Sequence, residues 1–306
     1  MRMRTLLATA VGAGAALALA ACATSGPAAG APGTGVLRVV AAENFWGSIA
    51  AQLGGRQVDV VSVIDNPTVD PHSYEATAAD GRAIAQADLV LLNGIGYDTW
   101  ATKLVDANPS PRRVVITVGD LLGVAAGGNP HRWYNPADVQ RVVSGLVAAY
   151  TRLEPARAAY FAQQETAFQT TALAPYRAVV ADIDARYAGT PIGASESIVA
   201  MLAPALGLDL LTPPDFLRAV SQGIDPTAAD KATIDAQIND HLIKVYVYNA
   251  QNATPDVAAQ IALARAAGIP VTTITETMVP ATATWEQWQT AQLVSLRDAL
   301  AKATGR

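Results

Sequence analysis

The first half of the sequence alternates short apolar runs with amphipathic stretches. Four runs rich in valine, isoleucine and leucine have the length of buried strands: 36–40, 58–64, 89–92 and 114–118. The stretches between them include 45–53 and 78–86, which are alanine-rich and place apolar residues at helical spacing. Continuous apolar strands that alternate with helices predict a parallel sheet covered by helices on both faces.

The middle of the chain has helical character with almost no interruption. Residues 138–152 predict one helix, and residues 155–187 predict a second one that Pro175 should kink or restart. If residues 155–187 form a continuous helix, they span about 50 Å at the usual rise per residue. A helix of that length could run along a molecule of two lobes.

The α/β pattern then returns. The predicted strands of the second half are 192–194, 244–248 and 271–275, and the predicted helices are 196–206, 227–240, 255–267 and 285–301. Gly207 and Gly268 each stand where a helix should end.

We therefore predict an α/β fold with two lobes, each built on a parallel-type sheet flanked by helices and joined by one long backbone helix. The predicted boundaries are 36–153 for the N-terminal lobe, 154–188 for the linking helix and 189–306 for the C-terminal lobe.

The segment before residue 36 fits neither lobe. Residues 1–21 combine a basic start with an alanine- and leucine-rich run, as in an export signal peptide. The run ends in LAAC at Cys22, which resembles the lipobox of bacterial lipoproteins, where the cysteine is acylated. Residues 22–35 are rich in glycine, alanine and proline and predict a flexible tether behind the lipidated cysteine. We expect an extracytoplasmic protein that is lipid-anchored to the bacterial cell membrane.

Composition narrows the possible partners. Hydrophobic residues make up 51% of the chain and charged residues 15%, so a sizeable core is possible. The net charge is −5, and no basic patch stands out, which argues against nucleic acid as a partner. Cys22 is the only cysteine, so an intrachain disulfide is excluded.

Two of the three histidines lie in matching loops. His72 lies in DPHSYE (70–75) and His131 in NPHRWYNP (129–136), so that each follows a proline and precedes an aromatic residue by two positions. Proline limits the backbone ahead of the ring, and the aromatic side chain can shield it, which would suit a metal ligand. An ordinary polar loop histidine is the alternative. His241 lies at the end of the predicted helix 227–240 and is interpreted as structural or solvated.

These two loops, with the stretches 50–60 and 87–94, resemble the zinc- and manganese-specific solute-binding proteins of ABC transporters, the cluster A-I metal receptors. The resemblance covers the chain from about Val36 to the C-terminus. It implies two α/β lobes joined by one long helix and a metal ion between them. It also implies a receptor without enzymatic activity that delivers its ion to the membrane permease of an ABC transporter. We expect a monomer.

The resemblance implies four metal ligands. Two are His72 and His131. The third is Glu196, eleven residues before the helix-ending Gly207, where the family has histidine or glutamate. The fourth is Glu276, at a position where the family usually has aspartate.

Alternatives exist for both glutamates. Ser195 could be the N-cap of a helix, and the negative charge of Glu196 could then stabilise the positive N-terminal end of that helix. Asp225 and Glu286 are weaker candidates for the fourth position. Glu43, which follows the first predicted strand, could line the cleft or start its helix.

Two asparagines depart from the family pattern. Asn129 and Asn135 stand where the second loop usually has aspartate. Either could hydrogen-bond the backbone or the ring of the ligand, with a lower charge around the site.

Two imidazoles and two carboxylates suit a divalent transition metal, Zn²⁺ or Mn²⁺, as the transported ligand. One alternative is a metal-dependent extracytoplasmic hydrolase, although the sequence has no His-Glu-x-x-His or Gly-x-Ser-x-Gly motif. Another is a metal-free solute receptor or adhesion lipoprotein, in which Trp46, Trp100 and Trp133 could supply aromatic contacts rather than pack the core. Metal binding should weaken between about pH 7 and 5, as imidazoles gain protons.

Overall fold

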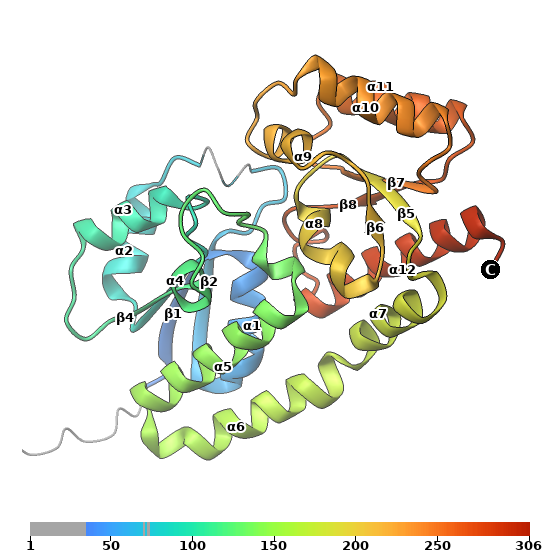
Figure 1. The fold of residues 1–306 in the computed structure, drawn as a ribbon. Helices are drawn as coiled ribbons and strands as arrows, with labels where there is room; N and C mark the ends of the chain where they lie inside the picture. The colour runs from blue at the N-terminus through green and yellow to red at the C-terminus, as the bar shows by residue number, and fades with distance from the viewer. Residues whose placement is uncertain (1–34, 70, 72–73) are drawn as a thin grey trace, which may run out of the picture. The chain divides into compact units, whose positions relative to one another are not determined.

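The computed structural model describes residues 35–69, 71 and 74–306 (Figure 1). The predicted signal peptide, most of the tether, Cys22 and His72 lie outside the described residues. Residues 34–306 form one compact unit. None of the helices in the described part of the chain is both long and apolar enough to cross a membrane.

The first sheet contains four parallel strands in the order β2-β1-β3-β4. The strands are β1 Leu37–Glu43, β2 Val58–Ile64, β3 Leu89–Leu92 and β4 Val114–Thr117. Val39 and Ala41 pack into one hydrophobic cluster, whereas Val40 and Ala42 pack into another. Both faces of β1 are therefore buried, which explains why the strand is apolar without alternation. We call this sheet and its helices the first lobe.

The helices of the first lobe are α1 Asn44–Gly54, α2 Ala78–Gln86, α3 Thr99–Ala107, α4 Val118–Leu122 and α5 Pro136–Leu153. Helix α2 begins with a capping box in which Thr77 and Asp80 satisfy each other's backbone N–H groups. Asn135 is the N-cap of helix α5, and its side chain accepts from the backbone N–H groups of Ala137 and Asp138. The 3₁₀ turns of this part are η1 Gly55–Gln57 and η3 Arg132–Tyr134.

The second sheet repeats this arrangement, with four parallel strands in the order β6-β5-β7-β8. Its strands are β5 Pro191–Ala194, β6 Asp209–Leu210, β7 Val245–Asn249 and β8 Val271–Ile274. Its helices are α8 Ile198–Leu202, α9 Pro214–Ser221, α10 Ala228–Asn239, α11 Pro255–Ala266 and α12 Trp285–Thr304, with a 3₁₀ turn η6 Ala203–Leu206. We call this part the second lobe. The two parallel sheets confirm the predicted fold class.

The segment predicted as a single helix over 155–187 is interrupted. It consists of η4 Pro155–Arg157, α6 Ala158–Ala167, a π-helical turn η5 Phe168–Ala172 and α7 Ala174–Tyr187 (Figure 1). Pro175 lies in the first turn of α7, where its missing N–H is not needed. The predicted restart of the helix at Pro175 is therefore confirmed, and the π turn lies directly before it.

A single hydrophobic cluster extends across both sheets. It includes Leu91 of β3, Val247 of β7 and residues of α5, α7 and α12. Helix α12 also contacts the first lobe. The backbone N–H of Trp285 donates to Ser48 Oγ at 2.9 Å, and Gln52 Nε2 donates to Glu286 Oε2 at 2.9 Å. The boundaries 36–153, 154–188 and 189–306 stay predictions.

Sequence patterns give no bounds for three short helices and one strand, α3, α4, α9 and β6. The predicted helix 196–206 is shorter than expected, since α8 begins only at Ile198 and passes into η6. Gly207 ends it in a left-handed conformation with φ of 62°, as predicted from its position.

Candidate metal centre

Polar side chains gather where the strands of both sheets end. Each sheet has a point at which the strand order reverses, between β1 and β3 and between β5 and β7, and ligands bind at such points in open α/β sheets. Glu43 is the last residue of β1, and Asn249 is the last residue of β7. Glu196 follows β5, and Glu276 follows β8.

His131 lies in the loop before η3, and Asn129 fixes its orientation. Asn129 Oδ1 accepts from the His131 backbone N–H at 3.1 Å and lies 2.9 Å from His131 Nδ1. Asn129 Nδ2 donates to the carbonyl of Ser197 at 2.7 Å, so the amide oxygen must face the ring. The Nδ1 atom therefore carries the proton, and the lone pair of Nε2 points elsewhere. The prediction that an asparagine of this loop bonds the ring is confirmed for Asn129.

Aromatic side chains surround the buried His131 ring. Trp133 meets it edge-on with ring centroids 5.3 Å apart, and Tyr97 does so at 6.3 Å. Behind them, Phe45 stacks on Trp133 at 3.8 Å. The predicted shielding of a loop histidine by the aromatic residue two positions later is confirmed for His131.

Two glutamates from the second lobe meet this histidine. His131, Glu196 and Glu276 each offer one ligand atom, and these atoms lie within 4.8 Å of one another. His131 Nε2 is 3.7 Å from Glu276 Oε1, which also accepts from the Tyr97 hydroxyl at 2.8 Å. Asn249 Nδ2 donates to Glu196 Oε2 at 3.1 Å and to Glu276 Oε2 at 3.5 Å. Three of the four candidate ligands thus lie together, whereas His72 lies outside the described residues, and their role as metal ligands stays a prediction.

The surroundings of the glutamates are rich in buried acidic groups. Burial, and then the charges of Asp98 and Glu276, raises the pKa of Glu43 well above its ordinary value. Burial also raises the pKa of Asp98 to about 6, although N–H groups of Asn93 and Gly94 donate to it and lower the pKa. Carboxyl groups confined together in this way favour a cation, because a positive ion offsets their repulsion.

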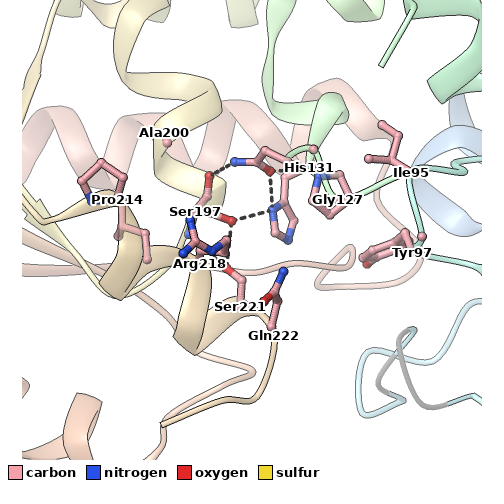
Figure 2. Close-up of a pocket in the computed structure, with 15 residues that line it drawn as sticks. Ile95, Tyr97, Gly127, His131, Ser197, Ala200, Pro214, Arg218, Ser221 and Gln222 are labelled. Atoms are coloured by element: carbon pink, nitrogen blue, oxygen red, sulfur yellow. Dashed lines mark hydrogen bonds between the residues drawn. The ribbon is translucent and has the colours of Figure 1, made fainter. Parts of the chain in front are cut away.

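Two cavities adjoin the cluster. The first, of about 370 Å³, is lined by His131 and Tyr97 from the first lobe and by Ser197 and Ser221 from the second (Figure 2). The second, of about 680 Å³, is lined by Glu276, Gln251 and the loop containing Pro67. The cluster is thus approached through space bounded by both lobes.

The alternatives for the fourth ligand lie elsewhere. Asp225 is exposed, and Glu286 accepts hydrogen bonds from Gln52 and Thr284. Neither belongs to the group formed by the three candidate ligands.

The capping interpretation of Ser195 and Glu196 is wrong. Ser195 Oγ accepts from the backbone N–H of Asn249 at 3.0 Å, so it joins the turn after β5 to the end of β7. Helix α8 begins two residues after Glu196, and Ser197 at its N-cap makes no side-chain capping bond. The turn therefore presents Glu196 to His131 ahead of the helix.

Other sequence expectations concern side chains around the cluster. Glu43 occupies the N-cap position of α1 but makes no side-chain capping bond. His241 follows α10, is exposed and has a φ of 52°. Trp46, Trp100 and Trp133 are all buried in the hydrophobic clusters, so they pack the core rather than line an open cleft.

Sequence reasoning did not identify Asn249 or Tyr97. The available signal for Asn249 is a polar residue that ends an apolar strand next to the reversal of strand order. No local pattern distinguishes Tyr97 from a core tyrosine. Its role depends on contact with Glu276, which lies 179 positions away.

Solved structures share the fold at low sequence identity. A periplasmic metal binding protein from Candidatus Liberibacter asiaticus aligns with a TM-score of 0.71 and 19% identity, covering 86% of this chain and 99% of that chain. FpvC from Pseudomonas aeruginosa, solved in complex with Mn²⁺, aligns with a TM-score of 0.69 and 21% identity, covering 88% of this chain and 99% of that chain. These alignments establish the similarity of the folds.

Curated relatives match over shorter segments. The metal ABC transporter substrate-binding lipoprotein SsaB of Streptococcus sanguinis is 34% identical over 112 residues, which are 32% of this chain and 36% of that protein. The iron-binding protein YfeA of Yersinia pestis is 28% identical over 137 residues, or 43% of this chain and 44% of that protein. The matched segments thus span less than half the length of these relatives.

A family-level comparison covers most of the chain. The profile described as zinc-uptake complex component A periplasmic matches residues 39–299, which include both sheets apart from the first two residues of β1, and the three clustered candidate ligands. By this match, the chain belongs to the zinc-uptake complex component A periplasmic family.

Proposed function

We propose that this protein captures a divalent transition metal ion, Zn²⁺ or Mn²⁺, between its two lobes and delivers it to the membrane permease of an ABC transporter. The observation that carries the proposal is the approach of His131, Glu196 and Glu276 to within 4.8 Å of one another. The three residues come from different segments and from both lobes, so their convergence is a property of the fold.

The donor types support a transition metal. Imidazole nitrogen with carboxylate oxygens forms a borderline donor set that suits Zn²⁺, Mn²⁺ and Fe²⁺, whereas Ca²⁺ and Mg²⁺ prefer oxygen alone. Asn129 orients the His131 ring by bonding Nδ1, the arrangement that metal-binding histidines usually have. We infer that His72 supplies a further nitrogen, because its loop matches the His131 loop in sequence.

The anchoring and partner of the protein are part of the same proposal. The signal-like residues 1–21 and Cys22 support export and lipid attachment outside the cytoplasm, with 22–35 as the tether. SsaB, with which the chain shares a segment, carries the name of a metal ABC transporter substrate-binding lipoprotein. A tethered receptor would hold its ion close to a permease in the same membrane.

We propose a receptor rather than a hydrolase. A catalytic zinc site keeps one coordination position for water beside a general base. Here Glu276 and the proposed His72 would join His131 and Glu196 as four protein ligands, which leaves a tetrahedral Zn²⁺ ion no position for a reacting water. An ion held by side chains from two lobes can instead be released when the lobes separate.

Calorimetric titration of metal-free protein tests this function. We expect one equivalent of Zn²⁺ or Mn²⁺ to bind, and Glu196→Gln and Glu276→Gln each to weaken binding on the order of 100-fold, because four ligands share a binding free energy of about 10–16 kcal/mol. Glu286→Gln is the matched control, since Glu286 is a buried carboxylate outside the cluster. Failure of the wild-type protein to bind any of Zn²⁺, Mn²⁺ and Fe²⁺, or an equal loss in Glu286→Gln, would contradict the proposal.

A further inference from the structure

Asn249 contacts both glutamates of the cluster. It is fully buried at the end of β7, and both ends of its side-chain amide are engaged. Its Oδ1 accepts from the Gln251 N–H at 2.9 Å, and its Nδ2 donates to Glu196 Oε2 and Glu276 Oε2 at 3.1 and 3.5 Å. The backbone N–H of Asn249 donates to Ser195 Oγ at 3.0 Å. The side chain is therefore fixed through three neighbouring groups.

The contacts of Asn249 also determine the direction of its amide. A backbone N–H can only donate, so the side-chain atom that meets the Gln251 N–H must be the oxygen. The NH₂ group then faces the two carboxylates and donates one hydrogen to each. A single amide thus engages one oxygen of Glu196 and one oxygen of Glu276.

The amide thus competes with a metal ion for Oε2 of both glutamates. The other oxygen of Glu276, Oε1, accepts from the Tyr97 hydroxyl and lies 3.7 Å from His131 Nε2. We propose that Asn249 is a positioning residue whose donation to both Oε2 atoms disfavours two-oxygen binding of a metal ion by either carboxylate and thereby favours Zn²⁺ over Mn²⁺ as the ligand. The inference rests on the proposed function, because it concerns the same metal site.

The physical reason lies in the number of donor atoms. Zn²⁺ is stable with four ligands in a tetrahedral arrangement, whereas Mn²⁺ prefers about six, mostly oxygen. Two carboxylates that bind through both oxygens supply four donors, but two that bind through one oxygen each supply only two. A site in which hydrogen bonds compete for two of these oxygens therefore penalises Mn²⁺ more than Zn²⁺. Sites with these donors bind Zn²⁺ more tightly in any case, so the informative quantity is the change in the ratio of the two affinities.

The test compares Asn249→Leu with the wild-type protein. Leucine has a similar volume and no donor, so it frees Oε2 of both glutamates. We expect the Zn²⁺-to-Mn²⁺ affinity ratio, measured by competition titration, to fall about tenfold or more, within the usual range for partners of metal ligands. X-ray absorption of the Mn²⁺-loaded variant should show more oxygen and nitrogen donors around the ion than in wild type. Asn249→Ala, which adds no bulk, replaces the leucine variant if that variant does not fold.

Gln260→Leu provides a matched control. Gln260 is another buried amide of the second lobe, and it accepts from the Tyr246 hydroxyl rather than contacting the glutamates. We expect it to lower stability without changing the affinity ratio or the donor number. If an Asn249 variant weakens the binding of Zn²⁺ and of Mn²⁺ by the same factor and leaves the donor number unchanged, this inference is overturned but the proposed function is not. A wild-type protein that binds neither ion overturns the proposed function.

Discussion

The two sheets have the same strand order, yet the residues at their carboxyl ends are held by different forces. In the first lobe, the His131 ring lies against Trp133 and Tyr97, and only Asn129 and Ser197 bond its Nδ1 among the contacts described. In the second lobe, the carboxylates of Glu196 and Glu276 are held by hydrogen bonds, which include those from Asn249. Aromatic packing can orient an imidazole ring, which offers a metal ion a single nitrogen, whereas two carboxylates offer four oxygens between them and need hydrogen-bond donors to restrict their orientation.

The largest expected effect is on the aromatic side of this comparison. Trp133→Ala removes a fully buried side chain that contacts Phe45, Tyr97 and His131, and it should lower the free energy of unfolding by about 3–5 kcal/mol. Denaturant unfolding of the metal-free protein measures the loss. Trp285→Ala is the control, because Trp285 is equally buried but packs on Tyr176. Both variants should be destabilised, and only Trp133→Ala should also weaken metal binding after correction for folded fraction. Equal metal affinities in the two variants would contradict the expectation that packing against Trp133 places the His131 ring for metal binding.

An intermediate effect is expected at the amide that orients the imidazole. Asn129→Ala removes the acceptor for His131 Nδ1 and should weaken binding about 10–100-fold. Zn²⁺ and Mn²⁺ should lose affinity by similar factors, because this amide sets the tautomer of the ring and leaves the donor count unchanged. Calorimetric titration with both ions measures the two factors.

Asn135→Ala is the matched control for Asn129→Ala, since Asn135 lies in the same loop and caps α5 instead. It should cost about 1 kcal/mol of stability and leave affinity unchanged. A loss of affinity in Asn135→Ala equal to that in Asn129→Ala would show that any disturbance of the loop weakens the site.

The smallest expected effect is a change of folding stability with pH. As the pH falls, stability should increase while metal affinity decreases. Burial raises the pKa of Asp98 to about 6 and raises that of Glu43, so the folded protein binds protons more readily than the unfolded chain. Their contribution to stability therefore increases as pH falls from about 7 towards 4. Metal affinity should decrease between about pH 7 and 5, because the imidazole must be neutral to bind.

Thermal unfolding of metal-free protein at pH 7, 6 and 5, with metal titrations at the same values, measures both trends. We expect the melting temperature to stay level or rise slightly while affinity falls, so that acid releases the ion from a folded protein. In Asp98→Asn, which removes the ionisable group, any rise should be smaller. A melting temperature that falls in parallel with affinity would indicate that acid acts by unfolding the lobes.

The repeated fold could be predicted from local sequence because its signals are local. Apolar runs such as 58–64 and 89–92 coincide with β2 and β3, and the stretch 78–86 coincides with α2. β3 is buried on both faces and is apolar throughout, whereas β2 is valine-rich but includes exposed positions such as Asp59. Helix α2 begins where a cap satisfies its first N–H groups, so these patterns can be read within a few residues. The short elements α3, α4, α9 and β6 carry too few residues for such a pattern.

The sequence by itself determined the order of the longer strands and helices and the family resemblance, which implied His131, Glu196 and Glu276 as candidate ligands that the structure brings together. Only the tertiary structure decided that Asn249 engages both glutamates, that Tyr97 reaches across to Glu276, and that Ser195 bonds β7 instead of capping a helix. The reason is that hydrogen bonding acts over about 3 Å in space, and partners separated by tens to hundreds of positions leave no common pattern along the chain.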